Sequence, residues 1–291
     1  MKKNFIILIP VYNDWKSVSK LLKEIDLQIV DWESEISVLI IDDASTEVRL
    51  DMDSNFKKIK SVKILNMKKN QGHGRSLATG LKFITEREIF DYVILMDADG
   101  EDRPEELNLF FNKSKEHPET VITANRIKRS EGLLFKSCYQ IHMYLTYIFT
   151  GHSIKFGNYT FLPKDSVFKM TEESSTWSSF SGSLTKLIPN RVSIPTIRSL
   201  RYFGPSKMSF FKLLIHSLSI IAVFKKTVFL RSLIFLSVYL LLIFQSLSFI
   251  TLLPVFLIIV LLFAVVCVSN RENLEQFKKS LDNISSIDNF N

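Results

Sequence analysis

Four acidic side chains follow one short apolar run in the stretch DYVILMDADGEDRPEEL. Val93–Met96 are apolar, and Asp97, Asp99, Glu101 and Asp102 come directly after them. Like charges at the end of a buried strand repel one another and lose hydration, so the cluster needs positive charge beside it. Such oxygen ligands suit Mg²⁺ or Mn²⁺, and arginine or lysine is the other candidate partner. We therefore expect a cation at this point of the fold.

An Asp-x-Asp pair alone is weak evidence, because surface turns contain it often. Here polar side chains also follow two other apolar runs, with Asn13 after FIILIPV and Asp42 and Asp43 within ISVLIIDD. The carboxyl ends of parallel strands meet at one edge of a sheet, and ligands bind beyond that edge. At such an edge Asp97 and Asp99 can hold a divalent metal that also binds a diphosphate.

The elements that would position these residues alternate along the first 125 residues. The expected strands are FIILIPV, ISVLIID, SVKIL, YVILMD and TVITAN, with helices near 15–29, 74–88 and 104–115. Strands separated by helices predict an α/β fold with a mostly parallel sheet covered on both faces. Further on, the chain is expected to be helical after Glu131, and FGNYTFLPKDSV is expected to form a strand and a turn.

The carboxy-terminal part is far more apolar, because residues 232–268 contain no charged side chain. One helix of this length would reach about 55 Å, whereas the hydrocarbon core of a bilayer is about 30 Å thick. A transmembrane hairpin with helices near 227–246 and 249–268, joined by a turn at Gln245–Ser248, fits better. A buried hairpin of a soluble protein is the alternative, although soluble cores rarely tolerate so long an uncharged run.

Segments on either side of this hairpin are also expected to meet the membrane. Residues 208–224 are too polar to span and too apolar to lie free in water, so we expect an interfacial amphipathic helix, with a core helix as the alternative. The positive-inside rule puts both outer ends in the cytoplasm, because these basic residues flank the hairpin: Lys225, Lys226, Arg231, Arg271, Lys278 and Lys279. The expected domains are an α/β domain at 1–205, the interfacial helix at 206–226, the hairpin at 227–268 and a cytoplasmic polar tail at 269–291.

The composition of the chain narrows the classes of partner that it is expected to bind. The chain is 46% hydrophobic and 23% charged, as in a folded protein, and carries a formal charge of +7. The basic residues are scattered and match no nucleic-acid-binding motif, so anionic lipid head groups are the expected partners. Cys138 and Cys267 do not indicate a disulfide framework. The start MKKNFIILIPVYN imitates a signal peptide, but the apolar run Phe5–Ile9 ends at Pro10, which favours a strand.

Five motifs occur in an order and spacing that resemble family 2 glycosyltransferases. They are IPVYND, IIDDAST, NQGHGRSLATGL, DADGEDRPEEL and RYFGPSKMS. Within that family they look most like the polyprenyl-phosphate glycosyltransferases, the group of dolichol-phosphate mannose synthase and bactoprenol glucosyltransferase. The resemblance covers about residues 4–215 and implies a GT-A-like catalytic domain, a nucleotide-sugar donor, a polyprenyl-phosphate acceptor and Mg²⁺ or Mn²⁺. It also raises the expectation of a homo-oligomer packed through the membrane helices.

The resemblance implies roles for individual residues. Pro10, Tyr12 and Asp14 would border the nucleotide, with Ile41 and Asp43 near its base. Metal and diphosphate would be surrounded by Asp97, Ala98, Asp99 and Glu101, of which Asp97, Asp99 and Glu101 bind the metal, and the phosphates would be held by Arg126, Arg201 and Lys207. Gly74 and Arg75 join the nucleotide-sugar site, because NQGHGRS resembles a phosphate-binding loop, although glycine pairs before helices are common.

Each assignment has a structural alternative. Tyr12 and Asn13 would also suit a strand-ending turn, and Asp43 would suit a cap. Arg201 and Lys207 would also suit a membrane surface. We interpret three further residues as exposed or surface residues: His73, Arg191 and Arg198.

Three positions depart from the family pattern. Asp14 replaces the usual Glu, and Glu101 replaces a residue that is often Gln. In GNYTFLPK, Thr160 replaces an arginine expected near the acceptor. The last change leaves the acceptor less certain than the donor.

We expect metal-assisted displacement at the anomeric carbon of a nucleotide sugar, with the inversion that the family implies. A lipid phosphate is already anionic at pH 7 and needs no strong base, and the sequence shows no obvious base. The first alternative is transfer to a hydroxyl of a lipid or glycan, with Asp102 or Asp165 as base. The others are a membrane accessory that keeps the fold without turnover, and a nucleotidyltransferase.

Overall fold

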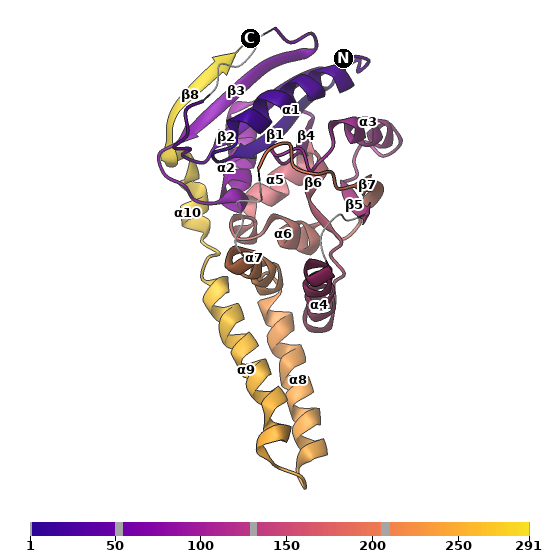
Figure 1. Ribbon diagram of the computed structural model, residues 1–291, viewed down its shortest axis with the longest axis vertical. Helices are drawn as coiled ribbons and strands as arrows, with labels where there is room; N and C mark the ends of the chain where they lie inside the picture. Colours follow the sequence, from indigo (N-terminus) through magenta and orange to yellow (C-terminus); the bar gives the residue numbers. More distant parts are fainter. Residues whose placement is uncertain (1, 50–54, 129–132, 205–209, 291) are drawn as a thin grey trace.

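The computed structural model describes residues 2–49, 55–128, 133–204 and 210–290 (Figure 1). Its strands are β1 (Asn4–Val11), β2 (Glu35–Asp42), β3 (Ile59–Met67), β4 (Tyr92–Leu95), β5 (Ile122–Lys128), β6 (Phe156–Pro163), β7 (Val192–Ile197) and β8 (Ile284–Phe290). They form one sheet in the order β7-β5-β6-β4-β1-β2-β3-β8. Strands β1 to β4 pair in parallel, as do β5 and β7, whereas β6 and β8 run antiparallel to their neighbours. The predicted α/β class with a mostly parallel sheet is confirmed.

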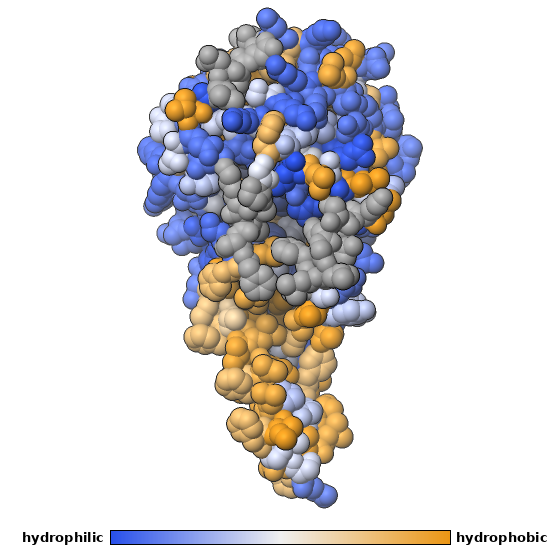
Figure 2. Space-filling model, in the orientation of Figure 1, coloured by the Kyte–Doolittle hydropathy of each residue, from blue (hydrophilic) through white to orange (hydrophobic). Residues whose placement is uncertain are grey.

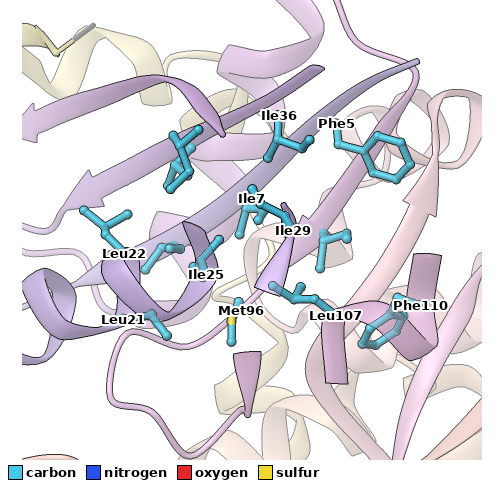
Figure 3. Packing of buried hydrophobic residues seen from close by; sticks show 14 of the residues in the cluster. Phe5, Ile7, Leu21, Leu22, Ile25, Ile29, Ile36, Met96, Leu107 and Phe110 are labelled. Carbon is cyan, nitrogen blue, oxygen red and sulfur yellow. The ribbon is translucent and has the colours of Figure 1, made fainter. Parts of the chain in front are cut away.

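Alternating side chains of the central strand β1 build two cores. Phe5, Ile7 and Ile9 pack with the apolar faces of α1 and α3 (Figure 3). Ile6 and Leu8 point to the opposite face and pack with α2, α5 and α6. The sheet is therefore covered on both faces, by α1 (Trp15–Gln28), α2 (His73–Arg87), α3 (Leu107–Glu116), α5 (Lys164–Glu172) and α6 (Phe180–Leu187).

Helix α2 packs against β1 at a close approach that favours glycine. A Cβ atom at Gly80 would lie 2.4 Å from Leu8 Cδ1 and 3.2 Å from Ile41 Cγ1. Without that atom the helix backbone lies directly on the sheet. This contact helps to set where α2 begins, at the edge where β1, β2 and β4 end.

The strands and helices expected before residue 160 are present in the structure, and one predicted turn after them is not. All five strands predicted in the first 125 residues are present, and the predicted helices correspond to α1, α2, and a 3₁₀ turn at Pro104–Glu106 that leads into α3. The helix expected after Glu131 is α4 (Leu133–Thr150). The turn predicted at the end of FGNYTFLPKDSV is wrong, because these residues begin α5, whose Val167 and Met170 are buried in the second core.

Two apolar helices, α8 (Lys225–Ile243) and α9 (Phe249–Ser269), run side by side away from the sheet (Figure 1). Both are long and apolar enough to cross a membrane, judged by length and composition. Only 17% and 6% of their most apolar windows are buried, so the apolar side chains face outward (Figure 2). The predicted helix pair is confirmed, and this exposure disfavours the alternative of a buried core hairpin.

A third apolar cluster joins this hairpin to the sheet domain. It contains Phe149 of α4, Ile221 of α7 (Phe210–Ala222), Val228 of α8 and Val265 of α9. Helix α7 buries this side while Phe211 stays 68% exposed, as expected of an amphipathic helix. Whether α7 lies in a membrane interface stays a prediction.

The residues after α9 return to the sheet, although they were expected to form only a polar tail. Helix α10 (Leu274–Lys278) packs Phe277 against Trp177, with ring centroids 5.6 Å apart. Strand β8 then pairs with β3 along its length. The apolar residues of β8 stand at every third position (Ile284, Ile287 and Phe290) and none of its residues is fully buried, so the sequence analysis missed this strand.

We predict that Phe277→Ala lowers the free energy of unfolding of the α/β domain by about 3 kcal/mol, because it empties a fully buried aromatic site. Urea unfolding in detergent, followed by tryptophan fluorescence, measures this change. The matched control is Phe249→Ala, whose ring is 88% exposed in the hairpin and should leave the transition unchanged. Equal effects of the two substitutions would show that the segment after α9 is not part of the domain core.

Candidate functional site

The acidic cluster directly follows β4, at the edge of the sheet where β1 ends and α2 begins. Met96 extends β4 by one hydrogen bond, from its N–H to the carbonyl oxygen of Leu8, and is fully buried. The chain then turns through Asp97–Asp102 at the carboxyl edge of the sheet. The edge predicted from the strand ends is therefore where the acidic side chains lie.

Asp102 is the buried support of the cluster. Its carboxylate accepts hydrogen bonds from the Asp97 backbone N–H at 3.0 Å and from Arg126 Nη2 at 3.0 Å. Burial and the charge of Asp97 raise the pKa of Asp102 to about 6, although Arg126 opposes the rise. The structure thus brings Arg126 to the cluster as predicted, as the partner of Asp102. Asp102 is only 2% exposed, which argues against its predicted alternative role as a base.

His73 contacts Asp97 directly, so its interpretation as an exposed loop residue is wrong. Its Nε2 atom lies 3.3 Å from Asp97 Oδ1 and 2.7 Å from Asn158 Nδ2. Burial alone would raise the pKa of Asp97, but His73 and Arg126 hold it well below its ordinary value. The sequence contained a usable signal, because His73 is the first residue of a helix that begins at this edge of the sheet.

Arg201 joins two carboxylates that the sequence analysis assigned to different parts of the site. Its guanidinium binds Asp99 through Nη1 and Asp14 through Nη2, the latter at 2.6 Å. Burial, with the charges of Asp97 and Glu101, raises the pKa of Asp99 to about 7. Asp14, Asp99 and Arg201 were all predicted site residues, and the structure brings them together.

The segment Arg198–Tyr202 lies across the acidic turn and closes it from one side. Ser199 N–H donates to the Glu101 carbonyl oxygen at 3.0 Å, and Tyr202 N–H donates to that of Asp99 at 2.9 Å. Gly100 has φ +81°, and the Tyr202 ring lies where a Cβ atom would be, so this turn requires glycine. Arg198 pairs with Glu101 and is a site residue, contrary to its interpretation as a surface residue.

The ends of β1 and β2 are tied to the loops that follow them. Asn13 Oδ1 accepts hydrogen bonds from the backbone N–H groups of Thr46 and Glu47. Asp43 accepts one from the backbone N–H of Gln71 and one from that of Gly72, each at 2.8 Å. Asp43 thereby orients the glycine-rich loop before α2, and its predicted contact with the base stays a prediction.

The remaining predicted residues divide into three groups. Tyr12 is 42% exposed beside this edge, whereas the side chains of Pro10, Ile41 and Ala98 are buried. Gly74 and Arg75 lie in the first turn of α2, and the Arg75 guanidinium lies over the Trp177 ring at 5.0 Å and pairs with none of the acidic cluster. Lys207 lies outside the described residues.

Known protein families provide a comparison for this sequence and its site. The sequence matches the family described as Glycosyl transferase family 2 over residues 6–172, which is more than half of the chain. The chain belongs to glycosyl transferase family 2.

Relatives of this family 2 member carry an informative name. This chain is 27% identical over 222 residues to the undecaprenyl-phosphate 4-deoxy-4-formamido-L-arabinose transferase of Klebsiella pneumoniae (strain 342). The alignment covers 73% of the chain and 64% of the relative. The protein of the same name from Salmonella choleraesuis (strain SC-B67) is 26% identical over the same shares. The chain thus spans about 64% of the length of these relatives.

Two solved structures share the fold of this family 2 member. Mannosyl-3-phosphoglycerate synthase from Rubrobacter xylanophilus matches with a TM-score of 0.54 at 12% identity, covering 77% of this chain and 73% of that one. Glucosyl-3-phosphoglycerate synthase from Mycobacterium tuberculosis, crystallised with Mn²⁺, UDP-glucose and glycerol 3-phosphate, matches at 0.51 and 12% identity, covering 77% and 80%. At this identity the likeness establishes the fold alone.

The acidic turn of this family 2 member fits a divalent metal only in part. Asp97 Oδ1 is buried and accepts no hydrogen bond, but His73 Nε2 lies 3.3 Å from it, so a cation at this oxygen would have to replace the His73 contact. Among the described residues, however, no three His, Cys, Asp or Glu side chains are gathered as a metal site, and Glu101 is paired with Arg198. Asp97 and Asp99 therefore fit a metal that completes its shell with diphosphate oxygens and water, a prediction in which Glu101 is not needed.

We predict that Asp102→Ala costs 3–5 kcal/mol, on the order found when a buried ion pair loses one partner. The substitution leaves Arg126, only 13% exposed, without its carboxylate. Chemical unfolding provides the measurement. As a control, Glu35→Ala breaks the exposed pair of Glu35 with Lys60 and should leave the unfolding transition nearly unchanged. Similar losses for both variants would refute the supporting role of Asp102.

We predict that Mn²⁺ binds about tenfold more weakly at pH 6 than at pH 8, because a proton competes for Asp99, whose pKa is raised to about 7. Lowering the pH protonates this carboxylate and removes a ligand charge, so affinity falls as pH falls through 7. Calorimetric titration of the full chain at the two pH values tests this. Asp99→Asn should bind weakly at both, and an equal wild-type affinity at both would contradict the assignment.

Proposed function

We propose that this protein transfers a sugar from a nucleotide-sugar donor to a polyprenyl phosphate of the undecaprenyl type, at the cytoplasmic leaflet of a bacterial-type inner membrane. Its family and the name of its relatives support sugar transfer and this class of acceptor. The exposed apolar pair α8 and α9 supports anchoring beside a lipid that stays in the bilayer.

The observation that carries the proposal is that the acidic edge of the sheet adjoins the foot of the apolar hairpin. Strand β6 runs antiparallel to β4, so it begins at the edge where the acidic turn lies. Its first residue, Phe156, packs against the cluster formed by Phe224 of the α7–α8 junction and Val228 of α8. A lipid held beside the hairpin would thus present its phosphate close to this edge.

Neither of the two carboxylates predicted as a base is placed to act as one, which favours a phosphate acceptor over a hydroxyl. Of the two predicted bases, Asp102 is buried and paired with Arg126. Asp165 follows Pro163, which pairs with Tyr92 at the start of β4, so it lies at the opposite edge of the sheet. An acceptor that is already anionic at pH 7 requires neither of them.

The reaction in this proposal is a single displacement with inversion. An acceptor phosphate oxygen forms a bond to the anomeric carbon as the bond to the leaving diphosphate breaks, and no proton moves. When bound, a divalent metal neutralises charge on that diphosphate. Asp97 and Asp99 would hold the metal, and Arg126 and Arg201 would stabilise the phosphates, for which Arg201 must leave its carboxylate partners.

Three parts of the proposal remain expectations. Pro10, Tyr12, Asp14, Ile41 and Asp43 would line the nucleotide site, with Ala98, Gly74 and Arg75 beside them. Lys207 would add a further phosphate contact, and the hairpins would pack into a homo-oligomer. Thr160 is fully buried on β6, opposite Leu95, so its side chain does not supply the acceptor contact that an arginine there would give.

We predict that the purified full chain moves radiolabelled sugar from a UDP- or GDP-sugar into an organic-extractable lipid only when undecaprenyl phosphate and Mg²⁺ or Mn²⁺ are present. EDTA should abolish the labelling, and Asp99→Ala should lower it by at least about 100-fold, because electrostatic stabilisation of the leaving group is lost. A panel of donors read by scintillation counting measures the transfer.

The matched control is Asp165→Ala, which removes a carboxylate from the opposite edge of the sheet and should keep full activity. Donor hydrolysis without lipid labelling would instead indicate a hydroxyl acceptor. Nucleotide binding without transfer or hydrolysis would indicate a non-catalytic accessory.

A further inference from the structure

A polar pocket of about 180 Å³ lies beside the acidic turn, between the strands at the far end of the sheet and the end of α6. Its lining includes Thr123 and Asn125 of β5, Phe156 of β6 and Ser193 of β7, together with the basic residues Lys155 and Arg191. None of these residues was assigned a role in sugar transfer. The pocket therefore needs an explanation of its own.

The pocket carries positive charge that no carboxylate neutralises within the described part of the chain. Arg191 is half-buried and donates to the carbonyl oxygens of Leu184 and Ile188, which leaves its charge uncompensated. Its guanidinium also lies over the Phe156 ring at 5.2 Å. Lys155 is exposed and forms none of the ion pairs found in the described residues. Two cations, with hydroxyl and amide groups between them, suit a phosphate group.

This pocket is separate from the acidic turn although both lie at the same edge. Phe156 and Asn158 are two residues apart on β6, which is about 7 Å along a strand, and Asn158 contacts His73 beside Asp97. Asn125 and Arg126 are adjacent on β5 and point to opposite faces of the sheet. A ligand in the pocket would therefore be a neighbour of the donor and not part of it.

The lining of the pocket is fixed to the foot of the apolar hairpin. Ile154 is buried in the cluster with Phe224 and Val228, and the residue that follows it is Lys155. The ring of His152 lies 4.5 Å from that of Phe224. Arg231 of α8 donates to the carbonyl oxygen of Ile148 at 2.9 Å, near the end of α4. The pocket is thus at the level where α8 begins.

At that level, α8 exposes apolar side chains next to the basic ones. Leu230 is 60% exposed and Leu233 is 63% exposed, on either side of Arg231. Basic groups directly beside exposed apolar surface correspond to the boundary between lipid head groups and acyl chains. The pocket therefore lies at the level where lipid phosphates would be.

We propose that this pocket binds the phosphate of an anionic phospholipid head group and so fixes the acidic edge relative to the bilayer surface. The proposal rests on the membrane anchoring in the proposed function, but not on sugar transfer. A phosphodiester with an uncharged head group carries one net negative charge, which Lys155 and Arg191 would both attract. The head group of phosphatidylcholine adds a cation and would be disfavoured in the same pocket.

The test is calorimetric titration of the delipidated full chain in detergent with dihexanoyl-phosphatidylglycerol, without nucleotide sugar. We expect saturable binding that is at least about tenfold tighter than that of dihexanoyl-phosphatidylcholine. Lys155→Ala should weaken binding about tenfold. Arg191→Lys keeps the charge but loses the fork of donors, and should weaken binding several-fold. The matched control is Lys169→Ala, which removes an exposed lysine of α5 and should have no effect.

The outcomes separate this site from the proposed function. Displacement of the lipid by inorganic phosphate at the same concentration would overturn the proposal, because it would identify a soluble phosphate as the ligand of the same pocket. No binding of the anionic lipid, equal binding of the two lipids, or equal affinities of the Lys155 and Lys169 variants would overturn the proposal. Loss of sugar transfer in Asp99→Ala with lipid binding intact would leave the pocket assignment standing.

Discussion

Three arginines and one histidine neutralise the acidic end of β4, and the rest of the site depends on this balance of charge. Arg126 comes from β5, Arg198 and Arg201 follow β7, and His73 begins α2. Buried carboxylates without such partners would lose several kcal/mol of hydration that nothing restores. The strands that carry the partners must therefore reach one edge before the acidic turn can be buried. The close approach of α2 at Gly80 and the closure of the turn at Gly100 also help to bring these partners to the acidic turn.

The same balance of charge determines which ion pairs a nucleotide-sugar donor has to break when it binds. Arg201 holds Asp99 and Asp14 together, so a diphosphate that recruits this guanidinium releases two carboxylates at once. One of them, Asp99, has a pKa raised to about 7 and gains most from a divalent cation. In the proposed reaction, negative phosphate and positive metal would therefore bind as a pair, since either alone would leave charge unbalanced.

Much of this architecture could be predicted from the sequence. Apolar runs of strand length that end in polar residues predicted the edge at which Asp97 and Asp99 lie, because side-chain alternation and strand ends are local properties. The ion pairs between Arg126 and Asp102 and between Arg198 and Glu101 could not be predicted, because they join residues on different strands and loops. Strand β8 was missed for a related reason: its pairing with β3 is set by the tertiary arrangement, and its own alternation is weak.

The return of the chain from α9 to β8 gives the hairpin two attachments to one rigid body. The chain enters the hairpin after α7, and it leaves through α10 into the same sheet, so both termini lie at the end of the molecule opposite the hairpin (Figure 1). A domain on a single linker can swivel above a membrane, whereas two attachments remove rotation about the tether. The sheet would thus keep one orientation relative to the membrane surface. A lipid substrate, which diffuses only in the plane of the bilayer, would then meet the sheet in one orientation.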